Sequence, residues 1–275
     1  MRMDRRAGLL SAGLPAKTTL NSTSWANIKI VSDAGQAANY WAIGDRKAVT
    51  LNGTVGALSF SSYSTYAFII GFDHNSTYEG SNRIHFQFAK TALTSGIDVC
   101  FIDNKYSTTG STDAFRMNTL NTNTGGWSSS YMRGTICGTS LSSYSGTFIG
   151  VLPSGLRTVL KSVTKYTDNT GGASTAAANV TSTTDYIFLL AEYEVFGSIT
   201  YANTNESAKQ KQYAYYSAGN STVKYRHSDT SSASIWWLRS PRRSNSTEFV
   251  FASVHGYADW YGAYYSYGFA PGFCV

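Results

Sequence analysis

The C-terminal part of the chain contains two bulky apolar segments, Trp236-Trp237-Leu238-Arg239-Ser240-Pro241 and Tyr267-Gly268-Phe269-Ala270-Pro271-Gly272-Phe273. Each includes a proline, and the second has glycines of the kind found where two backbone segments approach closely. We therefore expect both segments to be fixed framework, with Arg239 in a buried ion pair. The aromatic residues expected in the core are Trp236, Trp237, Phe249, Phe251, Phe269 and Phe273.

The segment between them has a different character. Six of the eleven residues from Tyr257 to Tyr267 are aromatic, and Gly, Ala, Ser and Asp separate them. They follow neither a strict alternation nor a helical period. Burying so many hydroxyl- and N–H-bearing rings together would require a hydrogen-bond partner for each. Because Tyr and Trp supply rigid contact area at a small entropic cost, the segment Tyr257–Tyr265 predicts an exposed binding surface.

Composition narrows the class of protein. Charged residues make up 14% of the 275 residues, there are 20 tyrosines, and the net charge of +6 is dispersed along the chain. A shortage of acidic residues explains this charge better than a basic stripe does, so no nucleic-acid partner is expected. No apolar run approaches 18 residues, so no membrane span is expected.

The three cysteines, Cys100, Cys137 and Cys274, are widely spaced and odd in number. No pair has the spacing of a zinc site or of a disulfide framework, so buried free thiols are the expectation. The basic N-terminus is followed by a short apolar run, residues 7–14, which is broken by Gly and Ser. We expect no signal peptide there, residues 1–20 as an N-terminal extension, and residues 21–275 as a single domain.

Hydrophobic periodicity predicts helices and strands in no βαβ rhythm, so the expected fold class is α+β. Helices are expected over residues 24–35, 127–136, 153–161 and 206–218, a turn at 52–53, and loops over 121–126 and 167–184. Strands are expected over residues 47–51, 66–72, 83–88, 98–102, 186–190, 236–238, 248–254 and 267–273.

Catalytic patterns are absent from the sequence. It has no HExxH, GxSxG, GxGxxG or Walker motif, and Asp73-His74-Asn75 has too few neighbouring ligands for a metal site. Glu192 and Glu194 are two residues apart after an apolar strand, where carboxylates usually pair with an arginine or cap a helix. A glycosidase pair remains the alternative. We therefore expect no catalytic residues, no metal and no cofactor.

The frame formed by WWLRSP and GFAPGF resembles that of the variable proteins of diversity-generating retroelements. It is also similar to a phage and prophage family of gut bacteria with the same closing frame. The helix–strand opening from Ser24-Trp25-Ala26 through Leu51-Asn52-Gly53, and the segment Asn121–Met132, fit this resemblance as well. The resemblance implies a C-type-lectin-like fold with mixed and antiparallel sheets, few helices and many loops. It also implies that the closing strands carry variable residues on one exposed face.

In such systems template adenines are mutated during reverse transcription, and most residue types between 242 and 265 are compatible with a mutated Asn codon. Trp260 departs from this pattern, because that codon cannot become a Trp codon. The candidate ligand contacts implied in this way are Arg242, Arg243, Ser244, Asn245, Glu248, Ser253, His255, Tyr257, Asp259, Trp260, Tyr261, Tyr264 and Tyr265.

The predicted function is therefore recognition of a protein or glycan target on a cell surface, without catalysis. The resemblance implies display on a phage tail or on the bacterial cell surface, either as a homo-oligomer or attached to a larger assembly. Two alternatives stay open: a glycan-acting enzyme that uses Glu192 and Glu194, and a purely structural subunit of a virion or surface layer.

Overall fold

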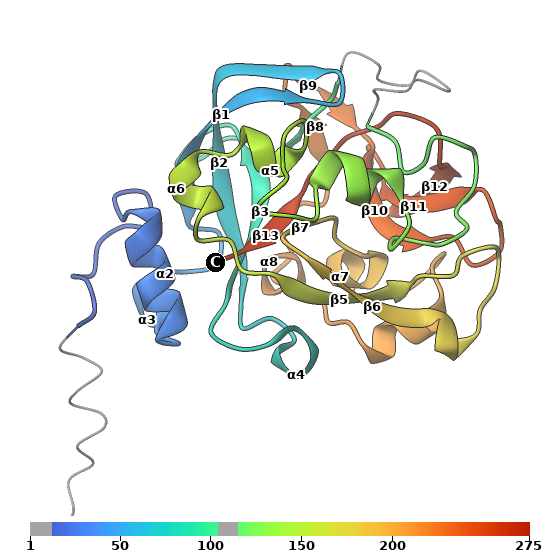
Figure 1. Cartoon of the computed structure of the whole chain (residues 1–275), viewed down its shortest axis with the longest axis horizontal. Coiled ribbons are helices and arrows are strands. Elements are labelled where there is room, and N and C mark those ends of the chain that lie inside the picture. Colours follow the sequence, from blue (N-terminus) through green and yellow to red (C-terminus); the bar gives the residue numbers. More distant parts are fainter. Residues whose placement is uncertain (1–12, 104–114) are drawn as a thin grey trace, which may run out of the picture.

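The computed structural model describes residues 13–103 and 115–275. Its largest sheet has five strands in the order β1-β2-β3-β13-β7, with antiparallel neighbours. The strands are β1 Arg46–Val55, β2 Leu58–Phe72, β3 Ile84–Lys90, β13 Gly272–Cys274 and β7 Ile187–Phe188. The last strand of the chain therefore lies between two strands formed much earlier, and Figure 1 shows it crossing the middle of the molecule.

The described residues also form three smaller β units. The strands β10 Trp236–Pro241, β11 Glu248–Ala252 and β12 Ala258–Gly262 form an antiparallel sheet. A second unit joins β4 Val99–Cys100, β8 Lys224–Arg226 and β9 Asp229–Ser234, and its β4–β8 pair is parallel. The third is a hairpin of β5 Val163–Asp168 and β6 Val180–Asp185.

The described helices are short. The α-helices are α2 Trp25–Asp33, α3 Ala37–Tyr40, α4 Ser76–Glu79, α5 Phe148–Val151, α6 Ser154–Arg157, α7 Glu192–Phe196 and α8 Ala214–Ser217. A π-helix covers Met132–Cys137, and 3₁₀ turns cover Ala177–Asn179 and Thr204–Ala208. None of these helices has the length and apolarity that crossing a bilayer requires. The predicted α+β class, rich in sheet and loop, is confirmed.

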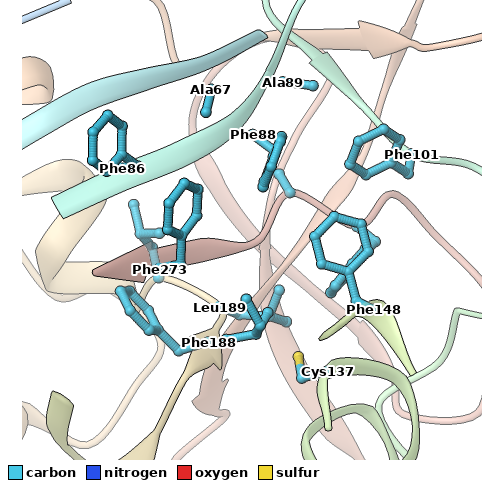
Figure 2. Close-up of a cluster of buried hydrophobic side chains, with 14 of the residues drawn as sticks. Ala67, Phe86, Phe88, Ala89, Phe101, Cys137, Phe148, Phe188, Leu189 and Phe273 are labelled. Atoms are coloured by element: carbon cyan, nitrogen blue, oxygen red, sulfur yellow. The ribbon is translucent and has the colours of Figure 1, made fainter. Parts of the chain in front are cut away.

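Aromatic packing around the last strand holds the core together. The ring of Phe273 stacks on Phe86 at 5.0 Å and lies 5.2 Å from Phe88, which meets Phe148 of α5 edge-on at 5.4 Å. Figure 2 shows these rings, together with Phe188, gathered around the last strand. Every aromatic residue that we expected in the core from the C-terminal frame is buried. The frame therefore ties the end of the chain into the main sheet.

Several predicted elements are confirmed and others are wrong. The first predicted helix is α2, with Ser24 as its N-cap. The strands predicted over 66–72 and 236–238 lie within β2 and β10, and the strand predicted over 83–88 overlaps β3. The predicted turn at 52–53 is instead a bulge in β1, and the chain turns at 56–57. Gly53 suits the bulge because its φ of +112° is open only to glycine.

Of the segment 167–184, expected to be a loop, residues 169–179 do connect two strands, but the first two residues end β5 and the last five form most of β6. The threonines of β6 favour a pleated strand, although the polar composition of the segment is typical of a loop. The helix expected over 206–218 is wrong, because the segment contains a 3₁₀ turn and the single-turn helix α8. The helices expected over 127–136 and 153–161 shrink to the π-helix and to α6. Of the strand expected over 267–273, Gly272 and Phe273 belong to β13, and Gly268 and Phe269 form isolated bridges.

Residues 1–12 of the predicted N-terminal extension lie outside the described residues. The described part of the extension contacts the domain. The Tyr40 hydroxyl donates to the Pro15 carbonyl, the Trp41 indole donates to the Thr18 carbonyl, and Leu20 is buried.

Candidate functional site

The three-stranded sheet β10-β11-β12 positions most of the predicted contact residues. In the β11–β12 register, Tyr261 pairs with Phe249, and Trp260 pairs with Val250. Because paired residues share a face and successive residues alternate, Tyr261 lies on the same face as the core residue Phe249. Trp260 therefore lies on the opposite face. The aromatic residues of β12 are thus divided between two sides of one strand.

Tyrosine rings gather on the Tyr261 side. The Tyr261 ring lies 4.6 Å from that of Tyr265 and 5.4 Å from that of Tyr267, edge-on in both cases. Tyr264 lies 4.8 Å from Tyr265, and a hydrogen bond with Tyr265 raises the pKa of Tyr264. Tyr267 is buried and packs on Trp237 and Phe251, while Tyr261 is 40% exposed. The cluster therefore runs from the core to the surface through contacts between rings.

On the other side, an arginine supports Trp260. The Arg242 guanidinium lies 3.7 Å from the centre of the Trp260 ring and forms an ion pair with Glu248. One face of the indole is therefore occupied by a cation whose charge is already balanced. Such a stack contributes on the order of 1 kcal/mol at a partly exposed site.

Asn123 holds the loop that carries Arg242. Its carboxamide nitrogen donates to the backbone carbonyls of Asn245 at 2.7 Å, Glu248 at 2.8 Å and Arg242 at 3.3 Å. Its carboxamide oxygen accepts from the N–H of Gly172 at 2.8 Å. Asn123 is buried, so these bonds are shielded from water and fix the loop between β10 and β11 firmly.

A surface depression of about 320 Å³ opens where β12 ends. Its lining consists of Asn121, Thr247, Glu248, Trp260, Tyr261, Gly262, Tyr264 and Tyr265. Leu120, which is 71% exposed, precedes the lining residue Asn121. The N–H of Asn118 donates to the Ala263 carbonyl, and this bond brings the 118–123 segment to the end of β12. A polar loop with no periodic pattern gave no signal of this contact, so sequence reasoning missed Asn121, together with Thr247 and Gly262.

The structure brings some predicted contacts together and separates others. Glu248, Trp260, Tyr261, Tyr264 and Tyr265 line the depression, and the Arg242 ion pair with Glu248 places that residue beside it. Tyr257, 54% exposed, lies at the other end of β12, four residues from Tyr261 and therefore about 13 Å away along the strand.

The remaining candidates have local partners. Ser253 is buried, and its hydroxyl accepts the N–H groups of His255 and Tyr257 in the β11–β12 turn. The Asp259 carboxylate accepts the N–H of Trp260, and the Asn245 carboxamide accepts the N–H of Thr247. The N–H of Arg243 donates to the Tyr201 carbonyl, whereas Ser244 is exposed. The thirteen candidates therefore do not form one continuous surface.

A second concentration of ionisable groups lies inside the fold. The Arg239 guanidinium forms two bonds to the Glu194 carboxylate, at 2.5 and 2.8 Å, so the predicted buried ion pair is confirmed. The Lys165 ammonium lies 3.1 Å from Glu194 and 2.7 Å from Glu79. Burial alone would raise the pKa of Glu194, but the two cations outweigh it and lower that pKa. Glu79, Lys165, Glu194 and Arg239 together form a buried ionic cluster.

His74 borders this cluster, and its Nε2 could join Glu79 and Glu194 as a third metal ligand within 4.8 Å. The Lys165 ammonium already bridges both carboxylates, so the negative charge that would attract a metal ion is balanced. Burial and the nearby Lys165 lower the pKa of His74 to about 3, which keeps the imidazole neutral. The donor set is therefore that of an internal salt bridge rather than of a metal centre.

Glu192 and Glu194 are both fully buried, and protein donors occupy their carboxylates. Glu192 accepts the N–H groups of Thr200, Tyr201 and Ala202 at 2.7 to 3.1 Å. A glycosidase pair must flank a bound sugar, which neither carboxylate can do from this position. The three cysteines are free and buried as predicted, and burial raises the pKa of Cys100 and Cys274 to about 12.

The molecule is thus an α+β protein with an aromatic depression at the edge of a small sheet and an ion-paired interior. The chain belongs to the DUF6273 family, described as a domain of unknown function, whose model matches residues 99–275. The matched part includes the whole β10-β11-β12 sheet and every residue that lines the depression. No curated protein and no solved structure matches the chain.

Proposed function

We propose that the protein is a ligand-binding protein, without catalysis, whose recognition site is the depression at the end of β12. The observation that carries this proposal is a set of partly exposed aromatic rings fixed on a rigid support. Tyr261 and Tyr265 rest on the buried Tyr267, and Trp260 rests on Arg242. Rings fixed before binding lose little conformational entropy when a ligand arrives.

The residue types at this site fit the usual energetics of recognition. Binding energy is usually concentrated in a few Tyr, Trp and Arg residues, which are surrounded by polar groups. The depression supplies Trp260 and three tyrosines, bordered by Asn121, Thr247 and the Arg242–Glu248 pair. Glu248 and Ser253 are buried, so we assign them to supporting the site rather than to contacting a ligand.

The resemblance to retroelement-diversified proteins extends the proposal. We propose that the fold is C-type-lectin-like, that residues between 242 and 265 vary among closely related copies, and that the protein is displayed on a phage tail or a bacterial cell surface. The position of the aromatic residues at the end of a fixed sheet supports this reading. A neighbouring reverse transcriptase gene, with a template repeat that differs from the codons after WWLRSP at adenines alone, tests it. A locus without either contradicts the diversification proposal.

Binding itself is tested with purified, fluorescently labelled protein on a panel of intact bacterial cells. We expect the wild-type protein to stay on at least one strain, and the double variant Tyr261→Ala/Tyr265→Ala to lose at least tenfold in affinity. Leu93→Ala is the matched control, because Leu93 is also 40% exposed and lies outside the depression. If the double variant binds like the wild-type protein, or the wild-type protein binds no cell, the proposal is wrong. Loss of binding in the control as well would also contradict it.

A further inference from the structure

The charge balance of the depression restricts what it can bind. Glu248 is the one ionisable carboxylate or cation in its lining, and Arg242 forms an ion pair with it. Arg242 also lies against the Trp260 ring, so its positive charge contacts the Glu248 carboxylate and the π face of the indole. A cationic ligand would meet a carboxylate that is already neutralised, and an anionic ligand would meet a guanidinium that is already engaged. The site therefore favours an uncharged ligand.

The lining combines flat rings with hydrogen-bonding groups. Trp260, Tyr261, Tyr264 and Tyr265 supply aromatic surface, and the carboxamide of Asn121 lies beside Gly262. The Thr247 hydroxyl donates to Asn245 at 2.8 Å and keeps its oxygen free to accept. A purely apolar ligand would leave these polar groups without partners, which is costly. The site therefore suits a ligand with an apolar face and a hydroxyl-bearing edge.

Size adds a third restriction. A volume of about 320 Å³ lies at the lower end of the range for small-molecule sites, so one ring-sized group fits and a folded protein element does not. A pyranose ring has this size, with C–H groups on a face that can lie on an aromatic ring and hydroxyls around its edge. We infer, on the basis of the proposed function, that the depression binds one ring of a neutral glycan through aromatic stacking and the polar groups of Asn121 and Thr247.

Gly262 keeps the depression open. A Cβ atom at this position would lie 2.7 Å from the Asn121 carboxamide oxygen, 3.1 Å from the Tyr264 ring and 3.3 Å from the Tyr265 ring. Alanine would therefore displace these lining groups at the position where the sugar edge is expected. The nearest contact is the tip of a side chain, so the substitution disturbs the site without disturbing the backbone. Gly155→Ala is the matched control, because a Cβ there meets nothing within 4 Å.

The experiment measures binding of the full chain to an array of neutral, sialylated and sulfated oligosaccharides. Tryptophan fluorescence then follows titration with the best neutral glycan. Trp260 is the partly exposed member of six tryptophans, and the other five are buried, so a shift in emission reports on this site. We expect a neutral glycan to bind and to shift the emission. Gly262→Ala should weaken this binding at least tenfold and leave Tm unchanged. Gly155→Ala should bind the glycan with the affinity of the wild-type protein.

Cell binding separates failure of this inference from failure of the proposed function. Target cells are treated either with periodate, which oxidises sugar diols, or with protease. Loss of binding after periodate, but not after protease, supports a glycan. Binding that depends on Tyr261 and Tyr265 but survives periodate and is lost after protease overturns the glycan inference and leaves the binding site in place. Binding to charged glycans alone on the array also overturns the inference of a neutral glycan. Cell binding that ignores both tyrosines overturns the proposed function itself.

Discussion

Two arginines three residues apart form ion pairs of different kinds. Arg239 lies within β10, fully buried, and makes two bonds to Glu194. Arg242 follows the end of β10, remains partly accessible, and pairs with Glu248 beneath the Trp260 ring. The first pair stabilises a charge that could not otherwise remain inside the fold, while the second supports a ring at the surface. The same chemistry therefore serves the core at one position and the candidate site at the other.

The largest expected effect comes from breaking the inner pair. Arg239→Met should lower the free energy of unfolding by about 3–5 kcal/mol, because Glu194 loses its main counter-ion inside the fold. Urea denaturation followed by circular dichroism measures the change. Arg242→Met is the matched variant, and we expect a loss of about 1 kcal/mol or less. The side chains of this pair are 20% and 12% exposed, so water can reach the Glu248 carboxylate once Arg242 is removed.

The double variant Arg239→Met/Glu194→Gln checks the cause, because it should recover part of the stability by removing the unpaired charge. Two results would contradict the expectation: Arg239→Met lowers the free energy of unfolding by less than about 1 kcal/mol, or it lowers it only as much as Arg242→Met does. Either result would show that the two ion pairs do not differ in their contribution to stability. If Arg239→Met fails to fold, Arg239→Lys provides the comparison, since it keeps the charge but cannot form both bonds in one plane.

The sequence predicts the buried framework around Arg239 better than it predicts the depression near Arg242. Bulky apolar residues around Arg239 indicated a buried framework with an ion pair, and burial follows directly from such local composition. The depression depends on Asn118 and Asn123, whose bonds join a polar loop to strands more than a hundred residues later. No local sequence pattern indicates a contact between residues so far apart in the chain, so Asn121 was not predicted.

A similar limit explains the wrong elements. The β5–β6 hairpin is rich in threonine, and its buried face includes Lys165 and Thr167, so the usual apolar alternation is missing. The side of β12 on which each aromatic residue lies depends on the register with β11, and one residue of slip would exchange the two sides. Composition therefore identified the aromatic segment, whereas strand pairing determined on which side of β12 each ring lies.

A pH dependence sharpens the comparison, because Glu206 is buried with hydrogen bonds but no dedicated cation. Its carboxylate accepts the N–H of Asp168 and bonds from Ser240 and Gln210, and burial raises its pKa to about 7. Between about pH 4.5 and 7 the folded state therefore holds a proton that the unfolded state has lost. The stabilisation is fully present below about pH 4.5 and is lost as pH rises through 7.

We expect the wild-type protein to lose on the order of 2–3 kcal/mol of stability over that range through this group. Glu206→Gln removes the titration, so its stability should fall less between pH 4.5 and 7.5. Urea denaturation at several pH values measures the difference between the two proteins, which cancels the contributions of groups they share. Parallel curves for the two proteins, or a wild-type protein that gains stability through this group as pH rises, would show that Glu206 is not held protonated.

The smallest expected effect distinguishes exposed rings from supporting ones. Tyr257 is 54% exposed, whereas Tyr267 is buried against Trp237 and Phe251. Tyr257→Ala should change the free energy of unfolding by no more than about 0.5 kcal/mol. Tyr267→Ala, its matched control, should lose about 3 kcal/mol, because it leaves a cavity beneath Tyr261.

Because Tyr257 lies about 13 Å from Tyr261, its removal should also alter the affinity for a neutral glycan less than twofold. Fluorescence titration of Tyr257→Ala measures this, with Tyr261→Ala as the variant expected to lose most of its affinity. Equal losses of affinity for the two variants would mean that the ligand spans both ends of β12. A large loss of stability for Tyr257→Ala would instead place that ring in the support of the sheet, together with Tyr267.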